Sequence, residues 1–126
     1  MTSKIAIVGA GPSGCFMAQS LGKACPDVEI SIIEKLPVPY GLVRYGVAPD
    51  HQGTKAVIRQ FARLFEKQGV NFAGNVNVGA GDAADLSLAE LRDIFDVVVL
   101  ATGVSEDRRL GLAGEETSGV YGSGAV

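Results

Sequence analysis

Six residues close to the N-terminus have the composition and spacing of a loop that binds phosphate. Glycines stand at Gly9, Gly11 and Gly14, in the pattern G-x-G-x-x-G. In such loops the first glycine permits a tight turn, and the second, having no side chain, lets a pyrophosphate approach the backbone. The third lets the following helix pack closely on a strand. Pro12 and Ser13 complete the loop GAGPSG, and we count them with the glycines as candidate cofactor-binding residues.

A carboxylate in the right place indicates which nucleotide this loop would hold. Glu34 lies twenty residues after Gly14, at the end of the next apolar run. At the end of a second strand, a carboxylate accepts hydrogen bonds from ribose hydroxyls and repels a 2′-phosphate, so the pattern favours FAD or NAD over NADP. The alternative is an ordinary turn followed by a surface glutamate.

The elements around the loop are those that a dinucleotide fingerprint requires. Residues 4–8 form a short β-branched run typical of a buried parallel strand, and residues 12–24 indicate a helix that Pro26 ends. Residues 28–33 form a second apolar run. G-x-G-x-x-G alone is a weak signal, but here it follows a strand and opens a helix inside one βαβ unit.

The rest of the chain completes an α/β pattern. We predict a Rossmann-like domain with a parallel sheet flanked by helices. Residues 35–50 are predicted to be neither helix nor ordinary strand. The further predicted elements are an amphipathic helix over 52–68, short strands over 71–73 and 76–78, a short helix opened by the capping box of 87–90, and a buried strand over 96–101.

Composition excludes several classes of protein. The 126 residues suffice for one domain, and a net charge of −3 argues against nucleic acid as a partner. Cys15 and Cys25 form no CxxC pair, which weighs against dithiol exchange and a zinc site; we expect Cys15 to fill a small buried space. No apolar run is long enough to span a bilayer, and there is no room for a cleavable signal, so we expect a cytoplasmic protein without a membrane partner.

The segment from Pro37 to Asp50 is restricted by prolines, opened by glycines and mainly apolar. Because it leaves the same sheet edge as the phosphate loop, it suits covering the flat body of a large cofactor. The alternative is a rigid surface loop. From these residues alone, FAD and NAD remain open.

Four segments resemble a known family. GAGPSG, EKLPVPYGLVRYGVAPDH, GNVNVG and LATG are similar to the adrenodoxin-reductase type of ferredoxin–NADP reductase, from Lys4 to about Tyr121. The small subunits of glutamate synthase have a comparable segment but continue differently after it, so they are the alternative. A non-catalytic nucleotide-binding fragment also stays open, whereas an NAD-dependent dehydrogenase is disfavoured because no catalytic residue set follows the motif.

The resemblance implies FAD as cofactor and a set of contacts with it. Ser13 would lie at the phosphates, Glu34 at the adenosine ribose, Leu42 near the flavin side and Val78 at the adenine. Thr102 and Gly103 match the segment where the chain passes the cofactor, and Lys35 and Gly41 are additional candidates.

The resemblance also implies the reaction. NADPH would deliver a hydride to the flavin, which passes electrons singly to a ferredoxin-like iron–sulfur protein. The cofactor performs this chemistry, so we expect no catalytic side chain and no metal, and a structural role for His51.

The family resemblance further implies a second, NADPH-binding domain, for which residues 1–126 contain no second glycine loop. We therefore expect the chain to be the N-terminal part of an FAD-binding domain. Alone it would be truncated, not competent for the whole reaction, and purified largely without cofactor. The basic stripe of Lys55, Arg59 and Arg63 could face an acidic ferredoxin, or it could be a solvated helix face.

Overall fold

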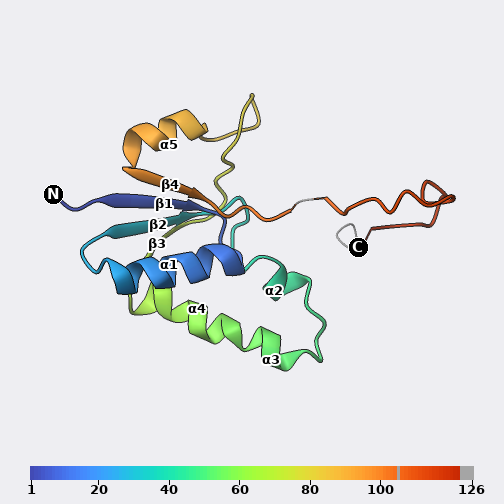
Figure 1. Cartoon of the computed structure of the whole chain (residues 1–126), viewed down its shortest axis with the longest axis horizontal. Coiled ribbons are helices and arrows are strands. Elements are labelled where there is room, and N and C mark those ends of the chain that lie inside the picture. Colours follow the sequence, from blue (N-terminus) through green and yellow to red (C-terminus); the bar gives the residue numbers. More distant parts are fainter. Residues whose placement is uncertain (105, 123–126) are drawn as a thin grey trace.

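The computed structural model describes residues 1–104 and 106–122 and contains one parallel sheet (Figure 1). Its strands are β1 (Lys4–Val8), β2 (Glu29–Ile33), β3 (Asn71–Ala73) and β4 (Val97–Leu100), in the order β3-β2-β1-β4. All neighbouring strands pair in parallel. The predicted α/β fold with a parallel sheet is confirmed.

Helices cover both faces of the sheet. α1 (Pro12–Ala24) and α4 (Val57–Glu66) lie on one face and α5 (Leu88–Ile94) lies on the other (Figure 1). Two helices of four residues each, α2 (Leu42–Tyr45) and α3 (Gln52–Lys55), lie in the connection from β2 to α4. The capping box predicted at residues 87–90 is present: the Ser87 hydroxyl accepts from the Glu90 amide, and the Glu90 carboxylate accepts from the Ser87 amide.

The alternation of β1 divides the core into two clusters. Ile5 and Ile7 point to the cluster beneath α1 and α4, which includes the fully buried Phe61. Ala6 and Val8 point to the smaller cluster beneath α5. Burying a side chain such as Phe61 contributes about 1.5–3 kcal/mol, so the first cluster fixes α4 and the loop that precedes it.

Three predicted elements differ from the structure. Residues 35–50 contain the helical turn α2. The helix predicted over 52–68 is divided at Ala56 into α3, which contains the weak helix former Gly53, and α4. Residues 76–78 form no strand, only a bridge from Val78 to Leu86.

The prediction of a buried strand over residues 96–101 is wrong in its burial. In this chain β4 is an edge strand, and its side chains Val97 and Leu100 are 48% and 60% exposed. A continuous apolar run indicates burial on both faces, but the run alone does not say which strand lies at the edge.

After β4 the chain leaves the layered domain (Figure 1). The described residues from 101 onward contain turns but no helix or strand. Of the glycine-rich end in which no second phosphate loop was recognised, residues 123–126 lie outside the described residues. Over residues 1–104 and 106–122, no helix combines the length and the apolar character needed to cross a membrane.

Candidate nucleotide-binding site

The strand order places a switch point between β1 and β4. From β1 the chain proceeds outward through β2 to β3, and then returns to the other side of β1 with β4. In open parallel sheets, ligands bind outside the carboxyl ends of the strands at such a point. Gly9 follows β1 and Ala101 follows β4 at this edge, where the Ala101 amide donates to the Val8 carbonyl at 2.8 Å.

Packing inside the protein explains two of the three glycines in the phosphate loop. Gly9 has a φ of 110°, and a Cβ there would lie 2.2 Å from the Ala101 carbonyl oxygen. A Cβ on Gly14 would lie 2.0 Å from the Gly9 carbonyl oxygen. These positions confirm the tight turn and the close approach of helix to strand that the motif predicted. Ala18, one turn further along α1, is also fully buried.

Gly11 is different, because the described part of the protein gives no internal reason for a glycine. Its φ of −72° and ψ of −174° are open to any residue, and a Cβ would meet no described heavy atom within 4 Å. The open space lies at the N-terminus of α1, directly at the switch point. A missing side chain that faces open space fits a loop whose backbone a phosphate approaches.

The N-terminus of α1 presents a favourable place for an anion. Pro12 is the first helical residue, and no described side chain caps the helix. The amides of a first helical turn have no partner within the helix, and the helix dipole adds partial positive charge there. Ser13 is exposed in this turn.

Glu34 is joined to the phosphate loop directly. One of its carboxylate oxygens accepts from the Ala10 amide at 2.8 Å, and the other accepts from the Leu36 amide at 3.1 Å. A carboxylate has about four lone-pair positions, so about two remain for ribose hydroxyls. The sequence motif located Glu34 but missed Ala10 and Leu36, because backbone amides leave no signal in residue type.

A second backbone segment reaches the same loop. The Tyr40 amide donates to the Ala10 carbonyl at 2.8 Å. Gly41 has a φ of 50°, and a Cβ there would lie 3.2 Å from the Gly11 Cα. The structure thus brings Gly41 to the site, and it adds Tyr40, which sequence reasoning missed.

The other predicted residues lie around this centre with less definition. Thr102 and Gly103 are exposed just beyond β4, Lys35 is exposed just after Glu34, and Leu42 is 70% exposed at the start of α2. Val78 is half-buried and packs with the cluster beneath α5. Their contacts with a cofactor stay predictions.

Cys15 and His51 are the other two residues for which the sequence predicted a structural role. Cys15 is fully buried, its Sγ lies 3.5 Å from the Ala10 carbonyl oxygen, and burial, with a smaller contribution from the charge of Glu34, raises its pKa to about 12. This confirms Cys15 as a small buried group with an unreactive thiol. His51 is exposed, and its carbonyl accepts from the Lys55 amide at 3.1 Å, at the start of α3.

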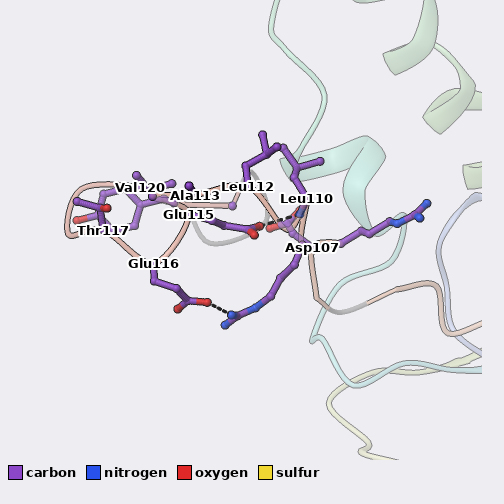
Figure 2. Close-up of a pocket in the computed structure, with 13 residues that line it drawn as sticks. Asp107, Leu110, Leu112, Ala113, Glu115, Glu116, Thr117 and Val120 are labelled. Carbon is purple, nitrogen blue, oxygen red and sulfur yellow. Dashed lines mark hydrogen bonds and ion pairs between the residues drawn. The ribbon is translucent and has the colours of Figure 1, made fainter.

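A hollow elsewhere in the chain has no part in this site. It is formed by residues 107–122 alone, in the segment that runs away from the sheet (Figure 2). Glu115 folds this segment by accepting from the amides of Leu110 and Gly111, and Arg109 pairs with Glu116. Among the described residues, no group of three or more histidine, cysteine or acidic side chains could hold a metal ion.

Comparison with known proteins agrees with the sequence resemblance. Residues 7–72 match the model of an NAD(P)-binding Rossmann-like domain. The chain is 58% identical over 123 residues to cindoxin reductase of Citrobacter braakii and 49% identical over 117 residues to the mitochondrial NADPH:adrenodoxin oxidoreductase of Arabidopsis thaliana. These alignments cover 97% and 93% of this chain but only 26% and 23% of the relatives.

A solved structure supports the same relationship. Mycobacterium tuberculosis FprA in complex with NADPH superimposes with a TM-score of 0.85 at 41% identity, over 95% of this chain and 27% of FprA. The predicted resemblance to adrenodoxin-reductase-type proteins is confirmed. The chain spans about a quarter of the length of the relatives it matches.

Proposed function

This chain belongs to the NAD(P)-binding Rossmann-like domain family, and from that membership we propose that it binds the ADP half of FAD in a flavin-dependent reductase. In the proposed reaction, electrons pass from NADPH through FAD to a ferredoxin-like iron–sulfur protein. The observation that carries the proposal is Gly11, whose missing side chain opens the α1 N-terminus beside the carboxylate of Glu34. This arrangement fits a pyrophosphate next to a ribose.

Glu34 supports FAD over NADP at this loop. Its carboxylate is fixed by two backbone amides, and its remaining acceptor positions suit ribose hydroxyls. A 2′-phosphate in the same place would be repelled. The Arabidopsis relative, whose name includes NADPH, is about four times as long as this chain, so we assign NADPH to a domain outside these 126 residues.

Proposed contacts follow the geometry of the loop. The first turn of α1 would hold the pyrophosphate, Glu34 the ribose, and the segment after β4 the continuing cofactor. When bound, FAD would supply the redox chemistry, and the residues of this chain would position it. The proposed cofactor-binding residues are Gly9, Gly11, Pro12, Ser13, Gly14, Glu34, Lys35, Gly41, Leu42, Val78, Thr102 and Gly103.

The second candidate is a nucleotide-binding chain without redox activity of its own. It is favoured by the exposure of Leu42, Thr102 and Gly103, which leaves the flavin side of the site open in this chain. An open site predicts weak affinity and purification without cofactor.

Titration of the purified chain with FAD tests the proposal. We expect a nearly colourless preparation that binds one FAD per chain, followed by flavin absorbance after removal of free FAD. Saturable binding of NAD in place of FAD would support the dehydrogenase alternative, and no binding of either would refute the proposed function.

We also propose a cytoplasmic location for the protein. Cys15 and Cys25 are free thiols, as is usual in a reducing compartment such as the cytoplasm. The Arabidopsis relative is described as mitochondrial. Cell fractionation with an antibody against the chain distinguishes a cytoplasmic from an organellar location.

A further inference from the structure

Tyr40 has a backbone conformation that side-chain-bearing residues rarely adopt. Its φ is 90°, beyond the left-handed region in which L residues are occasionally found. The other described non-glycine residue with positive φ is Asn75, at 59°, which is within that region and suits asparagine. Such strain persists only where the surrounding structure enforces it, and it clusters at ligand sites.

The side chain of Tyr40 is anchored in the helix layer. The residue is 8% exposed, and its ring stacks on Phe61, with 6.3 Å between centroids and an interplanar angle of 26°. Phe65 lies at 6.4 Å, and the Arg44 guanidinium lies 5.9 Å from the ring centroid. Burial raises the pKa of the Tyr40 hydroxyl, with smaller contributions in the same direction from Cys15 and Glu66, whereas the charge of Arg44 lowers it.

The backbone of Tyr40 is anchored on the phosphate loop instead. Its amide holds the Ala10 carbonyl, while Glu34 holds the Ala10 amide. Ala10 is therefore held on both sides, by Glu34 just after β2 and by Tyr40, whose ring packs on Phe61 and Phe65 of α4. The next residue, Gly41, is pressed against Gly11, because a Cβ added to Gly41 would lie only 3.2 Å from the Gly11 Cα.

We propose that Tyr40 is a positioning residue for the pyrophosphate, because its buried ring holds the Tyr40–Gly41 backbone against Ala10 and Gly11. The inference rests on the proposed function of the loop. A ring that served packing alone could be buried from a relaxed backbone. Here the strained backbone brings Gly41 against the Cα of Gly11, while the space that a Gly11 Cβ would enter stays open for a phosphate. The loop is therefore preorganised before the ligand arrives.

This role predicts that a substitution at Tyr40 weakens the binding of the phosphates and leaves the binding of the nucleoside unchanged. Glu34 holds the ribose end from β2, and its hydrogen bonds do not involve Tyr40. Loss of the ring should therefore weaken ADP, which has a pyrophosphate, more than adenosine, which has none. A merely structural role would weaken both ligands by the same factor.

The experiment compares the dissociation constants of ADP and adenosine by NMR titration of the intact 126-residue chain. For Tyr40→Ala we expect ADP to weaken by about tenfold, as for one lost contact of about 1.4 kcal/mol, with adenosine within about twofold of its original value. Tyr40→Phe keeps the ring and should rescue the ADP affinity. Tyr40→Leu, a second buried apolar side chain without a stacking ring, repeats the measurement if Tyr40→Ala does not fold.

Phe72→Ala is the matched control. Phe72 belongs to the same aromatic cluster, with its ring centroid 5.5 Å from that of Phe65, but it lies in β3. It should lower stability without changing the ratio of the two affinities. Equal weakening of ADP and adenosine in the Tyr40 variants, or a ratio no different from that of Phe72→Ala, would overturn the inference while leaving the proposed function intact. Absence of ADP binding to the unmodified chain would instead refute the proposed function.

Discussion

Gly11→Ala should affect ligand binding without affecting folding, because a side chain at position 11 would enter the space proposed for the ligand and would touch no other part of the protein. The added Cβ meets no described heavy atom within 4 Å, and the backbone angles of −72° and −174° suit alanine. Two small effects on stability then oppose each other. Alanine restricts the unfolded chain and stabilises by about 0.4–1 kcal/mol, whereas it is a poorer N-cap than glycine by about 0.5–1 kcal/mol. The net change in unfolding free energy should be within about 0.5 kcal/mol.

The effect on binding should be much larger. In the proposed complex the pyrophosphate occupies the space that the new methyl group enters. Forcing a methyl group into a packed contact costs about 1–3 kcal/mol, which corresponds to a dissociation constant for FAD that is about 5 to 150 times larger. Urea unfolding gives the first quantity and titration of flavin absorbance gives the second.

Gly14→Ala provides the contrast within the same loop. Its Cβ would lie 2.0 Å from the Gly9 carbonyl oxygen, a backbone atom, so α1 would have to move away from β1. We expect a loss of about 3 kcal/mol of unfolding free energy. The reasoning is refuted if Gly11→Ala binds FAD like the unmodified chain, or if Gly11→Ala destabilises the fold as much as Gly14→Ala does.

Three other predictions concern charge and protonation. The pKa of Cys15 is raised from 9.0 to about 12 by burial, so its contribution to stability is complete below pH 9 and is lost as the pH rises toward 12. Urea unfolding at pH 8 and pH 10 should show that, relative to Cys15→Ala, the unmodified chain loses unfolding free energy at the higher pH. A difference in unfolding free energy that stays the same at both pH values would contradict this. Glu34→Gln removes an acceptor for one backbone amide, so it should cost about 1–2 kcal/mol of stability and weaken FAD about tenfold, and unchanged affinity in the flavin titration would count against the ribose contact. No ion pair among the described residues neutralises Lys55, Arg59 or Arg63, so reversing all three to glutamate should weaken binding of an acidic ferredoxin about tenfold at low salt and leave FAD binding intact. Calorimetric titration measures the ferredoxin affinity. The docking role is refuted if a control variant with the same change in net charge loses as much ferredoxin affinity. That control reverses Lys23, Arg92 and Arg108.

The parts of the fold that local patterns determine could be predicted from the sequence. The phosphate loop, β1, α1 and β2 follow one another within thirty-three residues, and each has its own signal in spacing or residue type. Glu34 could be located because the motif fixes its distance from Gly14. The capping box before α5 could be predicted because it needs only residues 87 and 90.

What the sequence could not predict depends on contacts between distant residues. The hydrogen bond from Ala10 to Glu34 spans 24 positions and involves a backbone amide, which any residue but proline has. The positive φ of Tyr40 depends on its contacts with Phe61, Phe65 and the phosphate loop, so it could not be predicted from the residue type. The exposure of β4 follows from its place at the sheet edge, which its apolar run does not encode.

The central claim is that the α1 N-terminus and Glu34 together hold the ADP half of FAD. Competition between FAD and two nucleotides that differ only by a 2′-phosphate tests it most directly. FAD bound to the chain should be displaced by ADP but not, at the same concentration, by its 2′-phosphorylated form. Equal displacement by both nucleotides, or displacement by neither, would contradict the account.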